Sequence, residues 1–286
     1  MAGLRRRLGP RLRRARPGRP LARRHVLSFP RPQRPGGIPM PHTPPRPWHT
    51  VVLSPHFDDA VFSLAATLAG LPGPTAVVTV HGGAPPPGAP VSWWDAACGF
   101  SSAREAHRAR VAEDAAALAM IGVEQIVLDH PDGPYADGPE LQGLDAFLAG
   151  LPAGTDVWAP LGSNQTDHEN VRLRASRALD RLGAPLPRVY ADLPYTGHLP
   201  EWGTDRAGEA LAKSPMCGLA YQELLRTHRT TVHHHLVPDD AQWAAKRAAA
   251  QCYGSQLAPV AADHGNFLSR TGPLRAELVW SLESAC

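Results

Sequence analysis

The sequence contains few cysteines and no long hydrophobic segment. Its four cysteines, Cys98, Cys217, Cys252 and Cys286, are far apart and form no Cys-x-x-Cys pair. This spacing predicts free thiols in a reducing compartment, and it argues against a disulfide framework or a zinc ribbon. No apolar run approaches the ~20 residues that cross a bilayer. We therefore expect a cytoplasmic protein without a membrane span.

Acidic residues are absent from residues 1–48, which hold 13 arginines and 11 of the 31 prolines. Such a segment buries too little apolar surface to offset its ordering entropy, so we expect a disordered tail over 1–47, with Met40 as a possible true start. Charge alone would let the tail bind nucleic acid or an anionic membrane. A solvated tail is the simpler interpretation, so we expect no nucleic-acid partner. Removing residues 1–39 should leave the function of the remainder unchanged.

The rest of the chain lacks a G-x-G-x-x-G motif after its first predicted strand, so no dinucleotide cofactor is indicated. Hydrophobic patterns instead alternate between strands and helices. Strands are expected at 49–54, 75–81, 124–130, 155–160 and 187–193, and helices at 59–69, 103–121, 140–151 and 166–182. This order predicts one α/β domain over 48–286, with a Rossmann-like, mainly parallel sheet and helices on both faces. A less regular C-terminal portion follows, with a helix over 239–253 and a strand near 276–282.

Ionisable residues gather where the first strand ends, in the stretch "VVLSPHFDDAVFS". His56 and Asp59 are three positions apart as strand passes into helix, so both side chains can reach one point. A second histidine, His168 in "TDHEN", follows the fourth strand at the same predicted edge of the sheet. Two imidazoles and one carboxylate form a catalytic zinc set with a position left for water. Asp58 would face that position and could take a proton from the water.

Simpler interpretations exist for each of these residues alone. An aspartate at a helix start, such as Asp58, Asp59 or Asp167, is usually an N-cap. A single histidine is more often a hydrogen-bonded structural residue than a ligand. Neither interpretation explains why a histidine and two aspartates crowd one strand end while Asp-His marks another. Taken together, the residues favour a metal site.

The same stretches carry a family resemblance. "PHFDDAVFS" resembles the (P/A)HxDD motif of the LmbE/PIG-L family of zinc-dependent N-acetylglucosaminyl deacetylases, and "TDHENV" resembles the family's second metal motif. "RVAEDAAALAMIG" is similar to its Arg-x-x-Glu helix, and "LDHPDG" to the strand-end loop that follows. "YADLPY" and "KRAAAQCYGSQL" resemble C-terminal features of bacterial members that act on small molecules. The resemblance covers residues 51–257 and implies the same fold and a bound Zn²⁺ or another divalent metal.

The resemblance also implies roles for single residues. His56, Asp59 and His168 become the metal ligands, and Asp58 becomes the general base. Arg110 and Asp132 are expected to contact the substrate, and Asp132 and Asp167 could orient a ligating imidazole. Arg110 could instead be solvated or pair with Glu113. Trp93, in the Pro/Gly-rich loop after the second strand, could stack on a sugar ring or serve only as part of a lid or of the core.

One position departs from the family pattern. Many relatives have histidine where this chain has Gln165, and that histidine is thought to stabilise the oxyanion or to protonate the leaving amine. A glutamine amide can donate a hydrogen bond to an oxyanion but delivers no proton at neutral pH. We therefore expect Gln165 to serve the oxyanion. The acid would be Asp58 once it is protonated, or another residue such as His130 or His198.

The expected activity is metal-dependent hydrolysis of an N-acetyl group from an amino-sugar-containing small molecule, in natural-product biosynthesis for example. Two alternatives remain: an amidase that removes a larger acyl group from a sugar or thiol conjugate, and a degenerate member that binds sugar or metal without hydrolysis. The sequence leaves the oligomeric state open.

Overall fold

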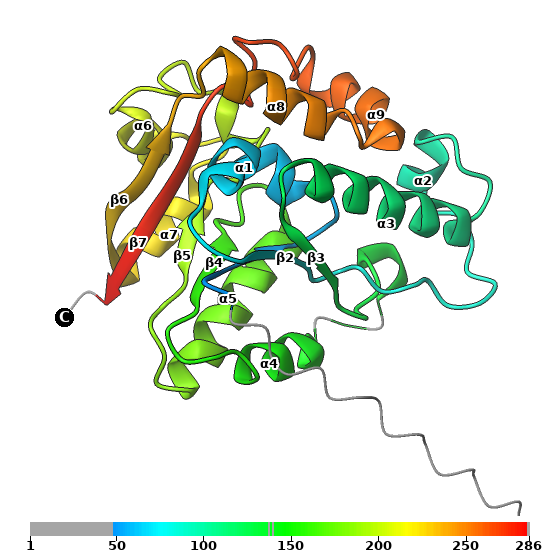
Figure 1. The fold of residues 1–286 in the computed structure, drawn as a ribbon, viewed down its shortest axis with the longest axis horizontal. Helices are drawn as coiled ribbons and strands as arrows, with labels where there is room; N and C mark the ends of the chain where they lie inside the picture. Colours follow the sequence, from blue (N-terminus) through cyan, green and yellow to red (C-terminus); the bar gives the residue numbers. More distant parts are fainter. Residues whose placement is uncertain (1–47, 137, 139, 285–286) are drawn as a thin grey trace, which may run out of the picture. The chain divides into compact units, whose positions relative to one another are not determined.

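The computed structural model describes residues 48–136, 138 and 140–284, and the predicted tail over 1–47 lies outside the described residues. Within them the strands form one sheet in the order β3-β2-β1-β4-β5-β7-β6 (Figure 1). The strands are β1 (Thr50–Ser54), β2 (Thr75–Thr79), β3 (Glu124–Val127), β4 (Asp156–Pro160), β5 (Arg188–Tyr190), β6 (His228–Leu236) and β7 (Glu277–Ser284).

The sheet has a parallel part and an antiparallel part. Strands β1 to β5 pair in parallel, whereas β7 runs antiparallel to both β5 and β6. The chain moves from β1 outward to β2 and β3, and then returns to place β4 on the other side of β1. The boundary between β1 and β4 is therefore the switch point of the sheet. In open α/β sheets, ligands bind outside the carboxyl ends of the strands at this point.

Helices cover both faces of the sheet, as predicted. The longer ones are α1 (Asp59–Gly70), α3 (Ala103–Met120), α4 (Gln142–Ala149), α5 (Thr166–Arg181), α8 (Asp240–Ala250) and α9 (Gly254–His264). The shorter ones are α2 (Trp93–Ala97), α6 (Ala207–Lys213), α7 (Leu219–Thr227) and the 3₁₀ helices η1 (Gly133–Tyr135) and η2 (Thr196–His198). Figure 1 shows α1, α3 and α8 on one side of the parallel strands, and α4 and α5 on the other.

The strand side chains explain this two-sided cover. In β1, Val52 packs into the cluster that includes α1, α3 and α8, whereas Val51 and Leu53 pack into the cluster with α4 and α5. Successive side chains point to opposite faces of a strand, and all five residues of β1 are buried. A continuous apolar run is typical of such a strand. The predicted α/β class with a mainly parallel sheet is confirmed.

The predicted helix over 239–253 is wrong in extent, because α8 ends at Ala250 and α9 starts at Gly254. Tyr253 leaves the helical conformation (φ −81°, ψ 53°) and turns its buried ring inward. Its hydroxyl donates to the Asp114 carboxylate at 2.7 Å, on α3. The break redirects α9 over α3, where it forms one wall of the cavity described below.

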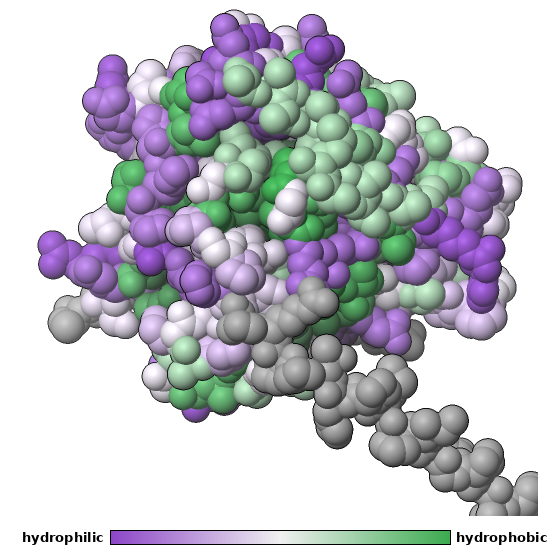
Figure 2. Space-filling view, viewed as in Figure 1, coloured by the Kyte–Doolittle hydropathy of each residue, from purple (hydrophilic) through white to green (hydrophobic). Residues whose placement is uncertain are grey.

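The cysteines of the described residues follow the composition-based prediction. Cys98, Cys217 and Cys252 are free thiols, and Cys286 lies outside the described residues. Among the described residues, no helix has the length and apolar character of a membrane span. In the face drawn in Figure 2, hydrophilic residues line the periphery and pale, weakly apolar residues gather over the alanine-rich α8 and α3.

Candidate metal centre and substrate cavity

The turn between β1 and α1 is held by the hydroxyl of Ser54. This hydroxyl donates to the His56 carbonyl at 2.6 Å and accepts from the Ala60 amide at 3.0 Å. The His56 amide donates to Asp59 Oδ2 at 2.8 Å. Asp58 occupies the N-cap position of α1 but makes no capping hydrogen bond with its side chain. The backbone is thus fixed without using the Asp58 carboxylate, which remains available for other chemistry.

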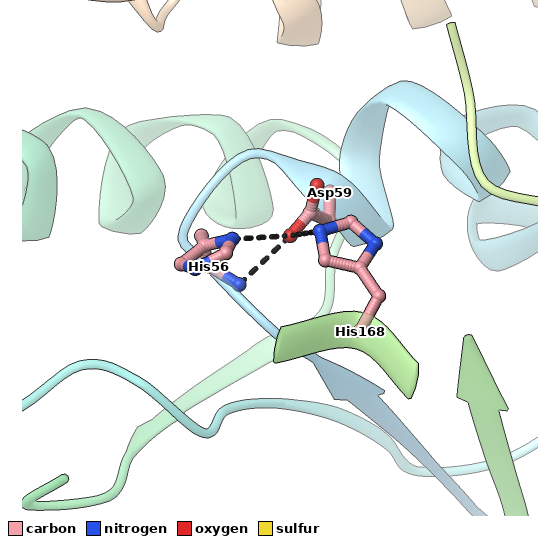
Figure 3. A group of neighbouring side chains, drawn as sticks. All are labelled: His56, Asp59 and His168. Atoms are coloured by element: carbon pink, nitrogen blue, oxygen red, sulfur yellow. Dashed lines mark hydrogen bonds and ion pairs between the residues drawn. The ribbon is translucent and has the colours of Figure 1, made fainter. Parts of the chain in front are cut away.

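His56, Asp59 and His168 converge as predicted (Figure 3). Asp59 Oδ2 lies 3.2 Å from His56 Nδ1 and 3.2 Å from His168 Nε2. One donor atom from each residue lies within 4.8 Å of the other two, so the three could hold one metal ion. They come from the β1–α1 turn, the start of α1 and the first turn of α5, on either side of the switch point. Two imidazole nitrogens and one carboxylate oxygen fit Zn²⁺, which binds four ligands and so accepts one more.

Asp192 fixes the orientation of the His168 ring. His168 Nδ1 lies 2.9 Å from Asp192 Oδ1, and both residues are buried. The other oxygen of Asp192 accepts from the amides of Gly162 and Ser163, each at 2.8 Å. A carboxylate that receives Nδ1–H sets the tautomer and leaves Nε2 for a metal. Burial lowers the pKa of His168, but Asp59 and Asp192 outweigh it and raise this pKa to about 9.

Asp132 and Asp167 lie beside the other nitrogen of His56, and one donor atom from each of these three residues also lies within 4.8 Å of the other two. His56 Nε2 lies 3.3 Å from Asp132 Oδ1 and 3.4 Å from Asp167 Oδ2. Burial acts to lower the pKa of His56, yet Asp132 and its neighbours raise that pKa well above its usual value. Asp167 does not cap α5, because Gln165 holds the N-cap position. The two carboxylates leave Nδ1 directed at Asp59.

Adjacent aspartates have opposite pKa shifts. Burial raises the pKa of Asp58 to about 6, and the Asp59 charge adds to that shift. Burial also acts on Asp59, but His168 and His56 outweigh it and lower its pKa below the usual range. A carboxylate that stays ionised suits a metal ligand, whereas one that titrates near neutrality suits a general base.

Arg110 is held by an acidic residue that sequence reasoning did not single out. Its Nη2 lies 2.6 Å from Asp95 Oδ1, and its Nη1 lies 4.0 Å from Asp132 Oδ2. The alternative pairing with Glu113 is wrong, because Glu113 accepts from the amide and hydroxyl of Ser255, each at 2.7 Å. Arg110 therefore lies next to the site, and Glu113 instead fixes the start of α9.

These groups line a cavity of about 440 Å³. One part is polar, with His56, Asp58, Asp132 and Arg110, and another is an apolar wall. The apolar wall includes residues from α1, α2, α9 and the loop after β5: Phe62, Trp94, Leu193, Val260.

Of the other residues that the sequence suggested for the site, only some line the cavity. Trp93 lines it and is 75% exposed, so this ring stands at the entrance. His130 and His198 are not among the residues that line the cavity. His198 instead lies exposed beside His264, with Nε2 and Nδ1 2.9 Å apart.

Gln165 is in the cavity, beside a tyrosine that was not predicted. Its Nε2 donates to the Tyr195 hydroxyl at 2.9 Å. Sequence reasoning missed Tyr195, Asp192 and Asp95. The stretch "YADLPY", already noted as a motif, holds two of them, and its polar residues at the end of a predicted strand were the available signal. Asp95 carries no such signal, because it depends on a contact between distant segments.

The comparisons with known proteins bear on the fold. No protein-family model matches the chain, and no curated protein matches it. Solved structures do. The A40926 pseudoaglycone deacetylase Dbv21 aligns with 23% identity and a TM-score of 0.62, over 84% of this chain and 99% of its own.

Two further solved structures align with this chain to a similar extent. A triple mutant of the deacetylase Orf2 from the teicoplanin biosynthetic pathway aligns with 22% identity and a TM-score of 0.62, over 83% of this chain and 98% of its own. The zinc-inhibited form of teicoplanin deacetylase Orf2 aligns with 21% identity and a TM-score of 0.61, over 82% and 98%. These likenesses show that the chain shares their fold over most of its length.

Proposed function

We propose that this protein is a metal-dependent N-deacetylase that acts on an acylated amino sugar within a small molecule. The observation that carries the proposal is the position of Asp59 Oδ2, 3.2 Å from one nitrogen of each imidazole, beside a carboxylate with a raised pKa. The fold shared with the teicoplanin and A40926 deacetylases supports the same reaction and a natural-product substrate.

His56, Asp59 and His168 would hold the ion, and Asp132, Asp167 and Asp192 would fix the imidazoles. When bound there, zinc would lower the pKa of a water and polarise the acyl carbonyl. Asp58 would take a proton from the water as its oxygen bonds to the acyl carbon. The protonated Asp58 would return this proton to the nitrogen as the C–N bond breaks, releasing acetate and an amine. Gln165 lines the same cavity as Asp58.

Arg110 and Asp132 would contact the hydroxyl groups of the sugar, and Trp93 would stack on the ring at the entrance. Acidic groups around the site suit a product that carries an ammonium group. The three free thiols are consistent with a reducing cytoplasm.

The cavity gives a second candidate some support. About 440 Å³ with an apolar wall leaves room for more than an acetyl group. An amidase that removes a longer acyl chain from the same amino sugar would use the same centre.

One experiment tests both candidates. Zinc-loaded protein would be supplied with glucosaminides that carry acetyl, hexanoyl or decanoyl groups, and the released acid would be measured. We expect acetate release to be fastest. Faster release of the longer acids would favour the second candidate, and no release from any substrate by fully loaded protein would support a non-hydrolytic binding protein.

A further inference from the structure

Tyr195 occupies a position in the cavity that the proposed reaction has not yet used. It lies between β5 and η2 and lines the cavity together with Asp58 and Gln165. Its ring packs edge-on against His168, with ring centroids 6.0 Å apart and planes at 82°. Tyr195 therefore packs against a proposed metal ligand and lines the same cavity.

Asp192, which orients the His168 ring, also stabilises the turn that contains Tyr195. The Asp192 carboxylate receives His168 Nδ1, and the carbonyl of the same residue accepts from the amide and hydroxyl of Thr196, at 3.1 and 3.0 Å. Asp192 and Thr196 are both buried. Tyr195 and His168 consequently keep a fixed relation to each other, as a pre-organised donor near a reacting group requires.

The direction of one hydrogen bond leaves the Tyr195 proton free. A phenol has one O–H donor and lone pairs that accept. Gln165 Nε2 donates to the oxygen and so uses a lone pair. Among the described residues, this is the one hydrogen bond that the hydroxyl makes. Its O–H hydrogen thus remains to be donated to a group in the cavity.

We infer that the Tyr195 hydroxyl donates a hydrogen bond to the oxyanion that develops on the acyl carbonyl, and that Gln165 acts by positioning this hydroxyl. The inference rests on the proposed function. Tyr195 keeps its proton throughout, because water supplies the proton that passes through Asp58 to the leaving amine. A tyrosine from a second loop thereby replaces the donor that a histidine at position 165 would provide.

Conservative variants test the role in turnover. Removing one oxyanion donor typically lowers kcat by about 10²–10³-fold, so Tyr195→Phe should lose about that factor with little change in KM. Its zinc content and melting temperature should match the wild type. Tyr221→Phe is the matched control, since its hydroxyl bonds Thr230 at 2.9 Å outside the cavity and its loss should leave kcat unchanged. A kcat within twofold of wild type for Tyr195→Phe would overturn the inference, as would a loss of zinc that accounts for the whole effect.

A second variant tests the positioning role of Gln165. Gln165→Glu puts an acceptor where the amide donated, so the Tyr195 O–H should turn toward the carboxylate and away from the carbonyl. We expect kcat to fall to the level of Tyr195→Phe, with no further loss in the double variant. Additive losses in the double variant would show that Gln165 acts independently of Tyr195.

Binding of a non-hydrolysable mimic separates this inference from the proposed function. A glucosamine that carries a methylphosphonyl group presents a tetrahedral oxyanion to the zinc-loaded protein without turnover. Tyr195→Phe should weaken its binding by about tenfold in calorimetry. If the wild-type protein released no acid from any substrate and Tyr195→Phe still weakened binding of the mimic, the proposed function would fail. Tyr195 would then remain a hydrogen-bond donor to a tetrahedral oxyanion in the cavity. Equal affinity of wild type and variant would contradict the donor role, whether or not acetate is released.

Discussion

Two ionic clusters among the described residues differ in charge balance, and one of them is partly exposed. Lys246 and Glu277 are both fully buried, and Lys246 Nζ lies 2.7 Å from Glu277 Oε1. The two Glu277 oxygens also accept from the amides of Ala66 and Thr67, at 3.0 and 2.7 Å. One positive charge meets one negative charge, and backbone donors complete the set. This cluster joins α1, α8 and β7, and needs no further ion.

The candidate centre is not balanced in this way. Four carboxylates contact its two imidazoles, and Asp58 stands beside them: Asp59, Asp132, Asp167, Asp192. Buried charges are normally paired or bound to a metal. The comparison teaches that an excess of one sign, where donor atoms also converge, distinguishes a functional cluster from a structural one. Changes in the centre should therefore alter chemistry or metal binding, and changes in the ion pair should alter stability.

The largest effect is expected from Asp58→Asn. The amide accepts no proton from water, and loss of a general base typically lowers rate by about 10²–10⁴-fold. Zinc content should stay the same because Asp58 is not a proposed ligand. Steady-state kinetics together with metal analysis checks both points. Turnover near the wild-type value would show that the base is another residue.

Lys246→Met should affect stability alone. It leaves the Glu277 charge buried without its partner, and breaking such a pair typically costs about 3–5 kcal/mol. Denaturant unfolding should show the loss, while zinc stoichiometry stays at the wild-type value. Adding Glu277→Gln should recover part of the stability. If Lys246→Met lost zinc while its unfolding was unchanged, the division between the two clusters would be wrong.

Asp192→Asn should weaken metal binding without removing a ligand. Loss of a carboxylate that orients a ligating histidine typically costs about 10–100-fold in metal affinity. Competition with a chelator would measure the change. Asp145→Asn is the matched control, because it breaks the ion pair with Arg174 at 2.7 Å, on the α4–α5 face, and should leave zinc affinity unaltered. Equal zinc affinity in Asp192→Asn and wild type would show that Asp192 does not support metal binding.

Zinc affinity should also depend on pH. With its pKa raised to about 9 in the metal-free protein, His168 is protonated at neutral pH and must lose that proton to bind zinc. Affinity should fall as pH drops below about 9, by roughly tenfold per unit for each proton released. Calorimetric zinc titrations at pH 6, 7 and 8, in buffers of different ionisation enthalpy, would measure the number of protons released when zinc binds. An affinity independent of pH over that range would contradict the assignment.

The sequence predicts the centre better than its surroundings, for physical reasons. The β1 run and the Asp-His at the start of α5 are local signals, and parallel strands bring their carboxyl ends to one edge. The role of Asp192 was not predicted because the hydrophobic pattern extended the fifth strand to residue 193. In the structure β5 ends at Tyr190, so Asp192 lies in the loop that follows.

Strand β6 and the boundary between α8 and α9 also could not be predicted from local sequence patterns. Strand β6 lies at the edge of the sheet, and its polar, histidine-rich sequence has no apolar alternation, so pairing with the distant β7 defines it. The boundary between α8 and α9 depends on the hydrogen bond from Tyr253 to Asp114, which no local pattern indicates.

The most direct test of the account is a crystal structure of the zinc-loaded protein with anomalous diffraction at the zinc edge. A single strong peak bound by His56 Nδ1, an Asp59 oxygen and His168 Nε2, with Asp58 facing its open side, is the predicted result. A peak elsewhere, or no peak in protein that metal analysis shows to be loaded, would contradict it.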